Sequence, residues 1–244
     1  MRLRIGTYTK PGTRPVNEDY VMTHMKDGRL LAVVADGLGG HDKGEVASKH
    51  VAEYIKEHFC FENDAEEELR RVINEAQNSL LELQRKEKAV NAMKSTVVVL
   101  AIKDGAGYIA HVGDSRGYVF DKKKRYKRTI DHSVPQMLAL AGDIKEKDIR
   151  NHTERSSLLR VLGSPWEKEA VESSEPIDLK GVRAFLLCSD GFWELITERD
   201  MMKCLKNSKS PEEWLLEMAE IIDNNGKGNE MDNYTAGAVF VLED

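Results

Sequence analysis

Cysteine is scarce in this sequence, and its positions exclude two kinds of site. The 244 residues include three cysteines, Cys60, Cys188 and Cys204, with no Cys-x-x-Cys pair among them. An odd number without such a pair argues against a disulfide framework and against a thiolate zinc site. We therefore expect three buried, reduced thiols and a cytoplasmic protein.

The sequence also lacks long hydrophobic runs and an excess of positive charge. Its longest apolar runs are strand-sized, such as VVVLAI at residues 97–102, whereas a membrane span needs about 20 apolar residues. The N-terminal MRLRIGTYTK has no apolar signal-peptide core. The net charge of −6 leaves no general basic face for phosphate backbones. We expect no membrane partner, no nucleic-acid partner and a monomer.

No repeat, low-complexity tract or Pro/Gly/Ser-rich linker interrupts the chain. A protein of this length, with 41% hydrophobic residues, can bury a full core. We therefore expect a single domain over residues 1–244.

Hydrophobic periodicity predicts strands and helices in a definite order. Alternating segments at residues 3–9, 20–25 and 30–35 indicate strands, with KDGR as a hairpin turn between the last two. Helical spacing follows over residues 47–59 and 69–83.

The middle and the end of the chain complete this pattern. The strand-like segments STVVVLAI, GYIAHVG and RGYVF are joined by short connections, which predicts an antiparallel meander. Residues 131–180 are irregular and polar. A buried strand, VRAFLLC, then precedes helices and a closing strand, NYTAGAVFV. This order predicts two packed sheets with helices outside.

Aspartates stand at the ends of the apolar strands. Asp36, Asp114 and Asp190 each follow one, and Asp232 precedes one. A single aspartate there is usually a cap or turn former. Four gathered at one end of a sheet would repel each other unless a cation lay among them. Carboxylates select Mg²⁺ or Mn²⁺, and no His-Glu-x-x-His pair favours zinc.

The glycine-rich loop DGLGGHDKGE is better suited to a cation than to a nucleotide. It lacks the Lys-Ser/Thr ending of a phosphate-binding P-loop, and the neighbouring hairpins argue against a dinucleotide fold. Gly37 would let its backbone carbonyl point at a metal. Arg14, three residues before Asn17, is a candidate phosphate clamp because a guanidinium binds phosphate oxygens in a fork.

Seven segments together resemble the metal-dependent protein phosphatases of type 2C, in their compact bacterial form. In order, these are RPVNED, VVADGLGGHDKGEVAS, STVVVL, HVGDSRGYVF, DHS, LLCSDGFWEL and DNYTAGAVFV, which cover nearly the whole chain. The resemblance implies an α+β fold: a four-layer α/β/β/α sandwich of two antiparallel sheets. It also implies a flap over about residues 133–179, beside the active site.

The resemblance further implies two tightly bound Mn²⁺ or Mg²⁺ ions and a third, weaker one. Asp36 would bridge the two metals, the Gly37 carbonyl would bind one, and Asp190 and Asp232 would bind the other. Asp114, with Asp190, would hold the third. The implied supporting residues are Glu18, acting through bound water; Asp19, behind the ligands; and Arg14, binding the substrate phosphate.

The implied reaction is hydrolysis of phosphoserine and phosphothreonine on proteins by a metal-bridging water. The substrates would be those of a Ser/Thr kinase. Leu38 stands where animal members carry a proposed general acid, and His41 is interpreted as a structural loop residue. A catalytically inactive relative and a nucleotide-binding protein are the alternatives. The basic run KKKRYKR at residues 122–128 is either a solvated hairpin or a docking patch for acidic protein segments.

Overall fold

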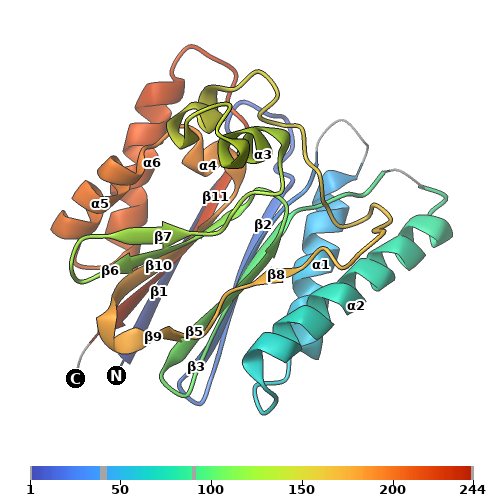
Figure 1. Ribbon diagram of the computed structural model, residues 1–244, viewed down its shortest axis with the longest axis horizontal. Helices are drawn as coiled ribbons and strands as arrows, with labels where there is room; N and C mark the ends of the chain where they lie inside the picture. Colours follow the sequence, from blue (N-terminus) through green and yellow to red (C-terminus); the bar gives the residue numbers. More distant parts are fainter. Residues whose placement is uncertain (1, 39–42, 90–91, 243–244) are drawn as a thin grey trace.

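Two antiparallel β-sheets pack face to face, and helices cover the outer side of each (Figure 1). The computed structural model describes residues 2–38, 43–89 and 92–242. The first sheet has the order β1 (Arg2–Lys10), β11 (Tyr234–Leu242), β10 (Val182–Cys188), β6 (Arg116–Asp121) and β7 (Tyr126–Arg128). The second has the order β2 (Asp19–Lys26), β3 (Arg29–Asp36), β4 (Val97–Lys103), β5 (Ala106–Val112) and β8 (Glu172–Ser173), with β9 (Ile177–Asp178) also paired to β5.

The helices are divided between the two sheets. Those on the second sheet are α1 (Gly44–His58) and α2 (Ala65–Lys86), and those on the first are α4 (Asp190–Trp193), α5 (Glu198–Asn207) and α6 (Pro211–Gly226). The segment between β7 and β10 carries α3 (Val134–Ala141) and the short 3₁₀ helices η1 (Glu146–Asn151) and η2 (Leu179–Gly181). The four-layer sandwich is therefore confirmed. No helix in the described ranges is long and apolar enough to cross a bilayer.

The apolar runs of the strands are continuous because both faces of each sheet are buried. Along β3, Leu31 and Val33 face the α1–α2 layer, whereas Ala32 and Val34 face the other sheet. This division follows from the two-residue period of a strand. Each sheet therefore needs one apolar face for its partner sheet and one for its helices.

The predicted meander is wrong at its last step. Strands β4 and β5 do pair, but β6 joins β10 and β7 in the other sheet. The chain changes sheet just after Gly113, whose φ of +106° is unfavourable for a side chain. A short connection can therefore join two sheets as well as two neighbouring strands.

The cysteine prediction is right for two of the three residues. All three cysteines are free; Cys188 and Cys204 are buried, but Cys60 is half-buried. The Cys60 thiol lies just after α1, where it donates to Glu62 Oε2 at 3.2 Å. This polar contact is made at the surface, outside the core.

Candidate functional site

Four of the predicted aspartates lie where the ends of the two sheets meet. Asp19 begins β2 and is the direct cross-strand partner of Asp36, which ends β3. Asp190 is the first residue of α4, directly after β10, and Asp114 lies two residues beyond β5. The two-sheet architecture thus brings together carboxyls that are up to 171 residues apart in the sequence.

Asp19 is a buried carboxyl with one oxygen unsatisfied. Its Oδ2 accepts a 2.7 Å hydrogen bond from Ser189, whereas its Oδ1 has no hydrogen-bond partner. Burial, together with the nearby charges of Asp190 and Asp232, raises its pKa to about 7. An unpaired buried oxygen costs free energy, so this group is suited to a further partner.

The other carboxyls in the cluster are perturbed in the same direction. Burial raises the pKa of Asp190 to about 6 and that of Asp36 well above its ordinary value, and neighbouring aspartates contribute to both shifts. Burial and Asp190 likewise raise the pKa of Asp114 well above its ordinary value. A cation bound among these carboxyls would favour their charged forms.

Gly37 and Glu18 are held by close backbone contacts at the start of α1. A Cβ on Gly37 would lie 2.2 Å from the Gly44 carbonyl oxygen, and one on Gly44 would lie 2.6 Å from Glu18 Oε1. The Gly37 amide donates to the Glu18 carbonyl at 3.0 Å. At Gly37 only glycine fits, because the crowding atoms are backbone atoms. At Gly44 the crowding atoms belong to the Glu18 carboxylate, which packs against the start of α1.

Arg14 and Asp232 form a forked ion pair at the open side of the site. Arg14 Nε and Nη2 donate to the two carboxylate oxygens of Asp232 at 3.2 and 3.1 Å. Both side chains are half-exposed, at 51% and 49%. The predicted phosphate clamp and the predicted metal ligand are therefore direct neighbours.

Asn233 fastens this region to the rest of the molecule. Its Oδ1 accepts from the Glu18 amide at 2.8 Å, and its Nδ2 donates to the carbonyls of Pro11 and Val16. The Asp232–Asn233 pair thus fixes the loop before β2 from the far end of the sequence.

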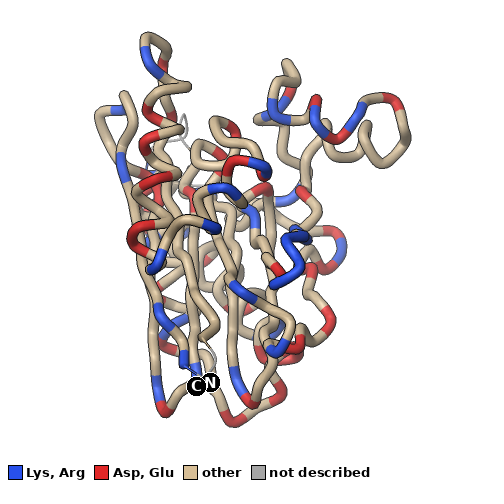
Figure 2. Tube along the Cα trace, turned by 90° about the vertical axis from the view of Figure 1, so that its left-hand side faces the viewer, with Lys and Arg blue, Asp and Glu red and all other residues tan. Residues whose placement is uncertain are grey.

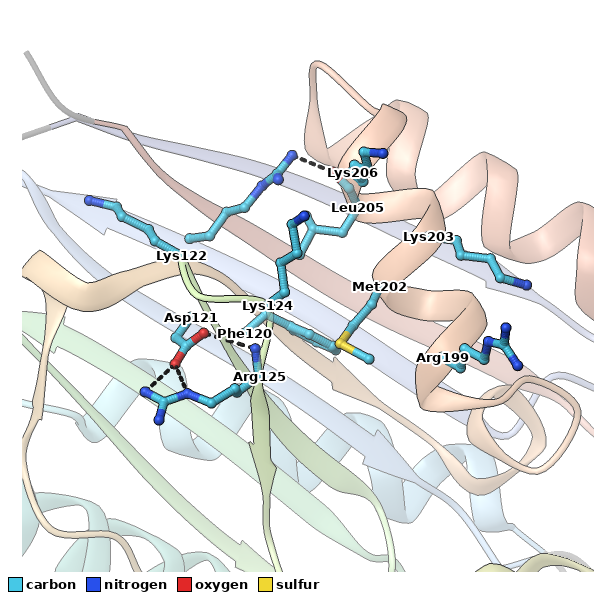
Figure 3. A pocket seen from close by; sticks show the side chains of 11 residues that line it. Phe120, Asp121, Lys122, Lys124, Arg125, Arg199, Met202, Lys203, Leu205 and Lys206 are labelled. Carbon is cyan, nitrogen blue, oxygen red and sulfur yellow. Dashed lines mark hydrogen bonds and ion pairs between the residues drawn. The ribbon is translucent and has the colours of Figure 1, made fainter.

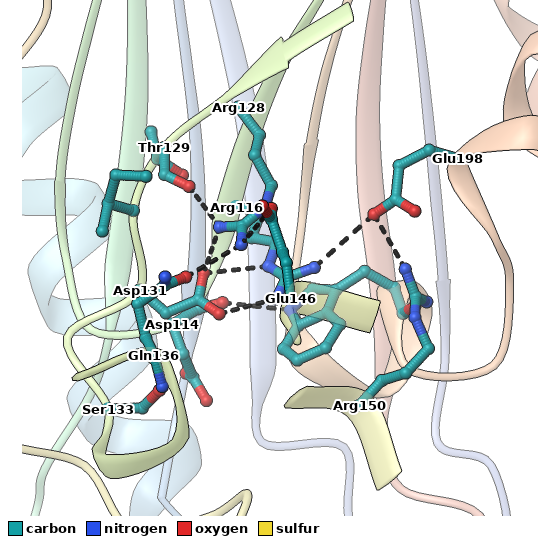
Figure 4. Close-up of polar contacts among 12 residues, drawn as sticks. Asp114, Arg116, Arg128, Thr129, Asp131, Ser133, Gln136, Glu146, Arg150 and Glu198 are labelled. Carbon is teal, nitrogen blue, oxygen red and sulfur yellow. Dashed lines mark hydrogen bonds and ion pairs between the residues drawn. The ribbon is translucent and has the colours of Figure 1, made fainter. Parts of the chain in front are cut away.

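A buried arginine network supports Asp114 from behind (Figure 4). Arg116 pairs with Asp131 at 2.6 Å and lies over the Trp193 ring, 3.4 Å from its centre. The Trp193 indole in turn donates to the Asp114 carbonyl at 3.0 Å. Within the DHS segment, Asp131 therefore has a structural partner, and Ser133 caps α3.

Comparisons with known proteins agree with this geometry. A sequence model of the protein phosphatase 2C family matches residues 12–233. The serine/threonine phosphatase stp of Listeria welshimeri is 31% identical over 191 residues, which cover 76% of this chain and 75% of that protein. The chain belongs to the protein phosphatase 2C family. It is a protein serine/threonine phosphatase.

Solved structures of phosphatases have the same fold. Stp1 from Staphylococcus aureus superposes with a TM-score of 0.90 at 27% identity, over 100% of this chain and 96% of that one. The catalytic domain of the phosphatase PstP, solved in complex with 2 manganese ions, gives a TM-score of 0.80 and covers 99% of both chains. At 23% identity, this second likeness shows the fold alone.

The carboxylate cluster of this phosphatase fits hard cations. All its donors are oxygens: Asp19 and Asp114 are buried, Asp36 and Asp190 are partly buried, and Asp232 is half-exposed. One oxygen of Asp19 has no hydrogen-bond partner. These oxygens do not form a tight triad in the described ranges, where Asp232 is turned to Arg14 and Asp19 to Ser189.

A tighter cluster of possible metal ligands, His111, His132 and Glu172, is a poorer fit. The two imidazoles stack with their centres 4.7 Å apart. His132 Nδ1 accepts from the Gly113 amide at 3.2 Å, so the proton of the neutral ring is on Nε2, the atom that faces Glu172. A metal-binding imidazole needs the opposite arrangement, with its second nitrogen donating.

Sequence reasoning missed Glu194. This residue lies directly after α4, within the LLCSDGFWEL segment; burial and the charge of Asp190 raise its pKa to about 7. It pairs with Arg155 at 3.0 Å. Its spacing of four residues from Asp190 on a helical turn was the available signal. Leu38 donates its amide to the Lys94 carbonyl, and His41 lies outside the described residues.

Proposed function

We propose that this phosphatase hydrolyses phosphoserine and phosphothreonine by direct, in-line attack of water at a centre of two Mn²⁺ or Mg²⁺ ions. The observation that carries the proposal is the buried cluster of carboxyls with raised pKa values, with a forked arginine at its open side. The manganese ions bound by the PstP domain support the choice of cation.

The proposed ligands are Asp36, the Gly37 carbonyl, Asp190 and Asp232, with Asp114 at a third, weaker site. When bound, the cations would lower the pKa of a coordinated water and neutralise charge on the phosphate. Glu18 is proposed to orient water from its position against Gly44. Asp19 is proposed to hold the ligands from behind through its bond to Ser189.

Arg14 is proposed to exchange its partner during substrate binding. In the fork with Asp232, its guanidinium already presents the geometry that suits two phosphate oxygens. Moving to the phosphate would free both Asp232 oxygens for a cation. Because a guanidinium stays charged at any working pH, any pH dependence of this contact would come from the phosphate.

The surrounding hydroxyl and thiol groups support direct hydrolysis over a covalent route. Ser189 is buried, donates to Asp19 and accepts from the Thr235 amide at 3.0 Å. Cys188 is fully buried, and burial raises its pKa. A covalent mechanism needs an exposed, activated nucleophile, which neither residue provides.

The substrates are proposed to be phosphoproteins made by a Ser/Thr kinase. We further propose a monomer of one domain, with residues 133–179 acting as the flap. Three free cysteines fit a reducing compartment, so we propose the cytoplasm as its location.

Metal-dependent turnover of p-nitrophenyl phosphate and of a phosphothreonine peptide tests the proposal. Activity should require Mn²⁺ or Mg²⁺ and disappear with EDTA. The purified Asp114→Ala variant should still bind two metal ions but should lose most of its phosphatase activity. Full activity in chelator would reject the metal centre, and loss of both tight ions would move Asp114 into the main site.

A further inference from the structure

A pocket lined mainly by cations lies at the far end of β6 from the carboxylate cluster (Figure 3). Its volume is about 280 Å³, and seven of its eleven lining residues are Lys or Arg against a single Asp. This is a local excess of positive charge on a protein of net charge −6. We call it the basic pocket and define it by Lys124, Arg183, Arg199 and Lys206 around Phe120 and Met202.

The β6–β7 hairpin and α5 supply most of the basic pocket, and Arg183 comes from β10. The β6–β7 hairpin brings Lys124, and α5 brings Arg199, Met202, Lys203 and Lys206, spaced so that they share one helix face. Both elements lie on the left of Figure 1, and Figure 2 turns that side to the viewer with Lys and Arg in blue. The basic run of the sequence is therefore half of a larger feature.

Several of these charges have no acidic partner. Arg125 pairs with Asp121 at 2.7 Å, and Lys203 pairs with Asp200 at 2.7 Å. In contrast, no carboxylate within the described ranges lies at ion-pair distance from Lys124, Arg199 or Lys206. Like charges held close together without partners favour an anionic ligand.

The floor of the basic pocket is apolar. Phe120 is buried and packs edge-to-face on Trp214, with ring centres 5.3 Å apart. Met202 and Leu205 extend this surface. A flexible thioether beside an aromatic ring accepts apolar side chains of several shapes. The fitting ligand therefore combines an apolar side chain with several negative charges.

We propose that the basic pocket docks an acidic segment of the phosphoprotein substrate, with an apolar side chain seated among its carboxylates. The proposal rests on the phosphatase function and deepens it. The catalytic end carries many carboxyls and offers little attraction to such a segment, so a separate cationic site would recruit it.

The length of β6 sets the spacing required of the substrate. This strand runs from Arg116, two residues after Asp114, to Asp121 at the hairpin. Its five residue steps span about 17 Å. An extended peptide covers about 3.4 Å per residue. The acidic segment should therefore lie at least five or six residues from the phosphorylated side chain.

Matched peptides and variants test the docking proposal. One phosphothreonine peptide carries a Leu flanked by four Glu after an eight-residue Gly/Ser spacer, and its control has Gln in place of Glu. At low salt, we expect kcat/KM to be about tenfold higher for the acidic peptide, with the advantage fading at ~0.5 M salt as charges are screened.

The variant Arg199→Glu/Lys206→Glu should abolish this advantage. Lys56→Glu/Lys86→Glu makes the same charge change on α1 and α2 and should keep it. p-Nitrophenyl phosphate turnover should be unchanged in both. The proposal is overturned if the acidic peptide keeps its higher kcat/KM in Arg199→Glu/Lys206→Glu, or loses it equally in Lys56→Glu/Lys86→Glu. It is also overturned if the higher kcat/KM persists when the spacer is cut to three residues.

Binding of the unphosphorylated acidic peptide, measured by fluorescence anisotropy, separates docking from catalysis. Wild-type protein should bind it and the Arg199→Glu/Lys206→Glu variant should not, whether or not the enzyme turns over phosphate. Absence of wild-type binding overturns the docking site alone. Binding of a single-stranded RNA oligonucleotide instead of the peptide, lost in the same variant, would also overturn it.

Discussion

The two ends of strand β6 hold charge in opposite ways. Near Arg116 the charged groups are buried, and carboxyls crowd together with raised pKa values. At Asp121 the charged groups are mostly exposed, and cations crowd over an apolar floor. Crowding buried charges is costly without a counter-ion, whereas exposed charges stay hydrated. The carboxyls near Arg116 therefore need a bound cation to be stable in their charged form. The exposed cations near Asp121 are stable without a ligand.

The strongest test of this contrast is Asp36→Asn. Asp36 is a proposed metal ligand, so its loss should reduce turnover by at least ~10²-fold, because the attacking water would no longer be positioned. In EDTA the same variant should melt at a higher temperature than wild type, since one of several mutually repelling buried carboxyls is gone. Asp143→Asn, at an exposed position, is the matched control for both measurements. Wild-type turnover in Asp36→Asn would contradict the assignment.

Arg14→Ala should have the next largest effect. A clamp that contacts phosphate in both the ground and transition states contributes uniform binding, so KM should rise about tenfold with a smaller fall in kcat. Steady-state kinetics on a phosphothreonine peptide measures this split. Arg14→Lys keeps the charge but loses the fork and should be intermediate. An unchanged KM would leave Arg14 as a partner of Asp232 only.

His132 differs from both ends of β6, because it is a buried titratable group that stays neutral. Burial, with the stacked His111 ring, lowers its pKa to about 4, although Glu172 opposes the shift. The unfolded chain takes up this proton below about pH 6.5 and the native state does not. Stability is therefore lost as pH falls from about 6.5 to about 4.

His132→Asn removes that titration. The melting temperature of the variant should fall less than that of wild type between pH 6.5 and 4.5, by roughly 2–4 °C for each kcal/mol involved. Asn can still accept from the Gly113 amide, and His58→Asn, at an exposed position, serves as the control. Parallel melting curves for variant and wild type would show that His132 is not the group responsible.

The smallest effect is expected at the basic end. Arg199→Gln and Lys124→Gln should each shift the melting temperature by less than ~1 °C, because exposed charges without partners contribute little to stability. Calorimetry at neutral pH is sufficient. A loss of several degrees would mean that these cations support the fold, and the contrast between the two ends of β6 would fail.

The placement of much of the carboxylate cluster could be predicted from sequence because its residues stand at strand ends. Asp36 ends one apolar strand and Asp190 follows another, so each stands where an apolar run changes to polar residues. Glu194 was harder, since its perturbation depends on packing against Asp190 from a neighbouring turn. The phosphate-clamp prediction for Arg14 came from its place beside Asn17 and Glu18, but its pairing with Asp232 could not be read from either segment.

The change of sheet between β5 and β6 could not be predicted for a different reason. A connection of a few residues is compatible with a hairpin and with a crossing, and only the packing of β6 beside β10 decides between them. The same limit applies to the basic pocket. The basic run at residues 122–128 was visible in the sequence, but no neighbouring residue indicated that α5 lies against it.

The link between Asn233 and the loop at residues 11–18 has a consequence for biosynthesis. Arg14 and Asp232 are separated by 218 positions, and β11 lies between β1 and β10. At about 5–20 residues per second, a ribosome needs roughly ten to forty seconds to pass from the first to the second. Until the last strand enters its gap, the emerging polypeptide has neither a complete first sheet nor Asp232. Because the proposed metal ligand Asp232 would be missing, we expect such a nascent chain to be unable to act on the phosphoproteins around it.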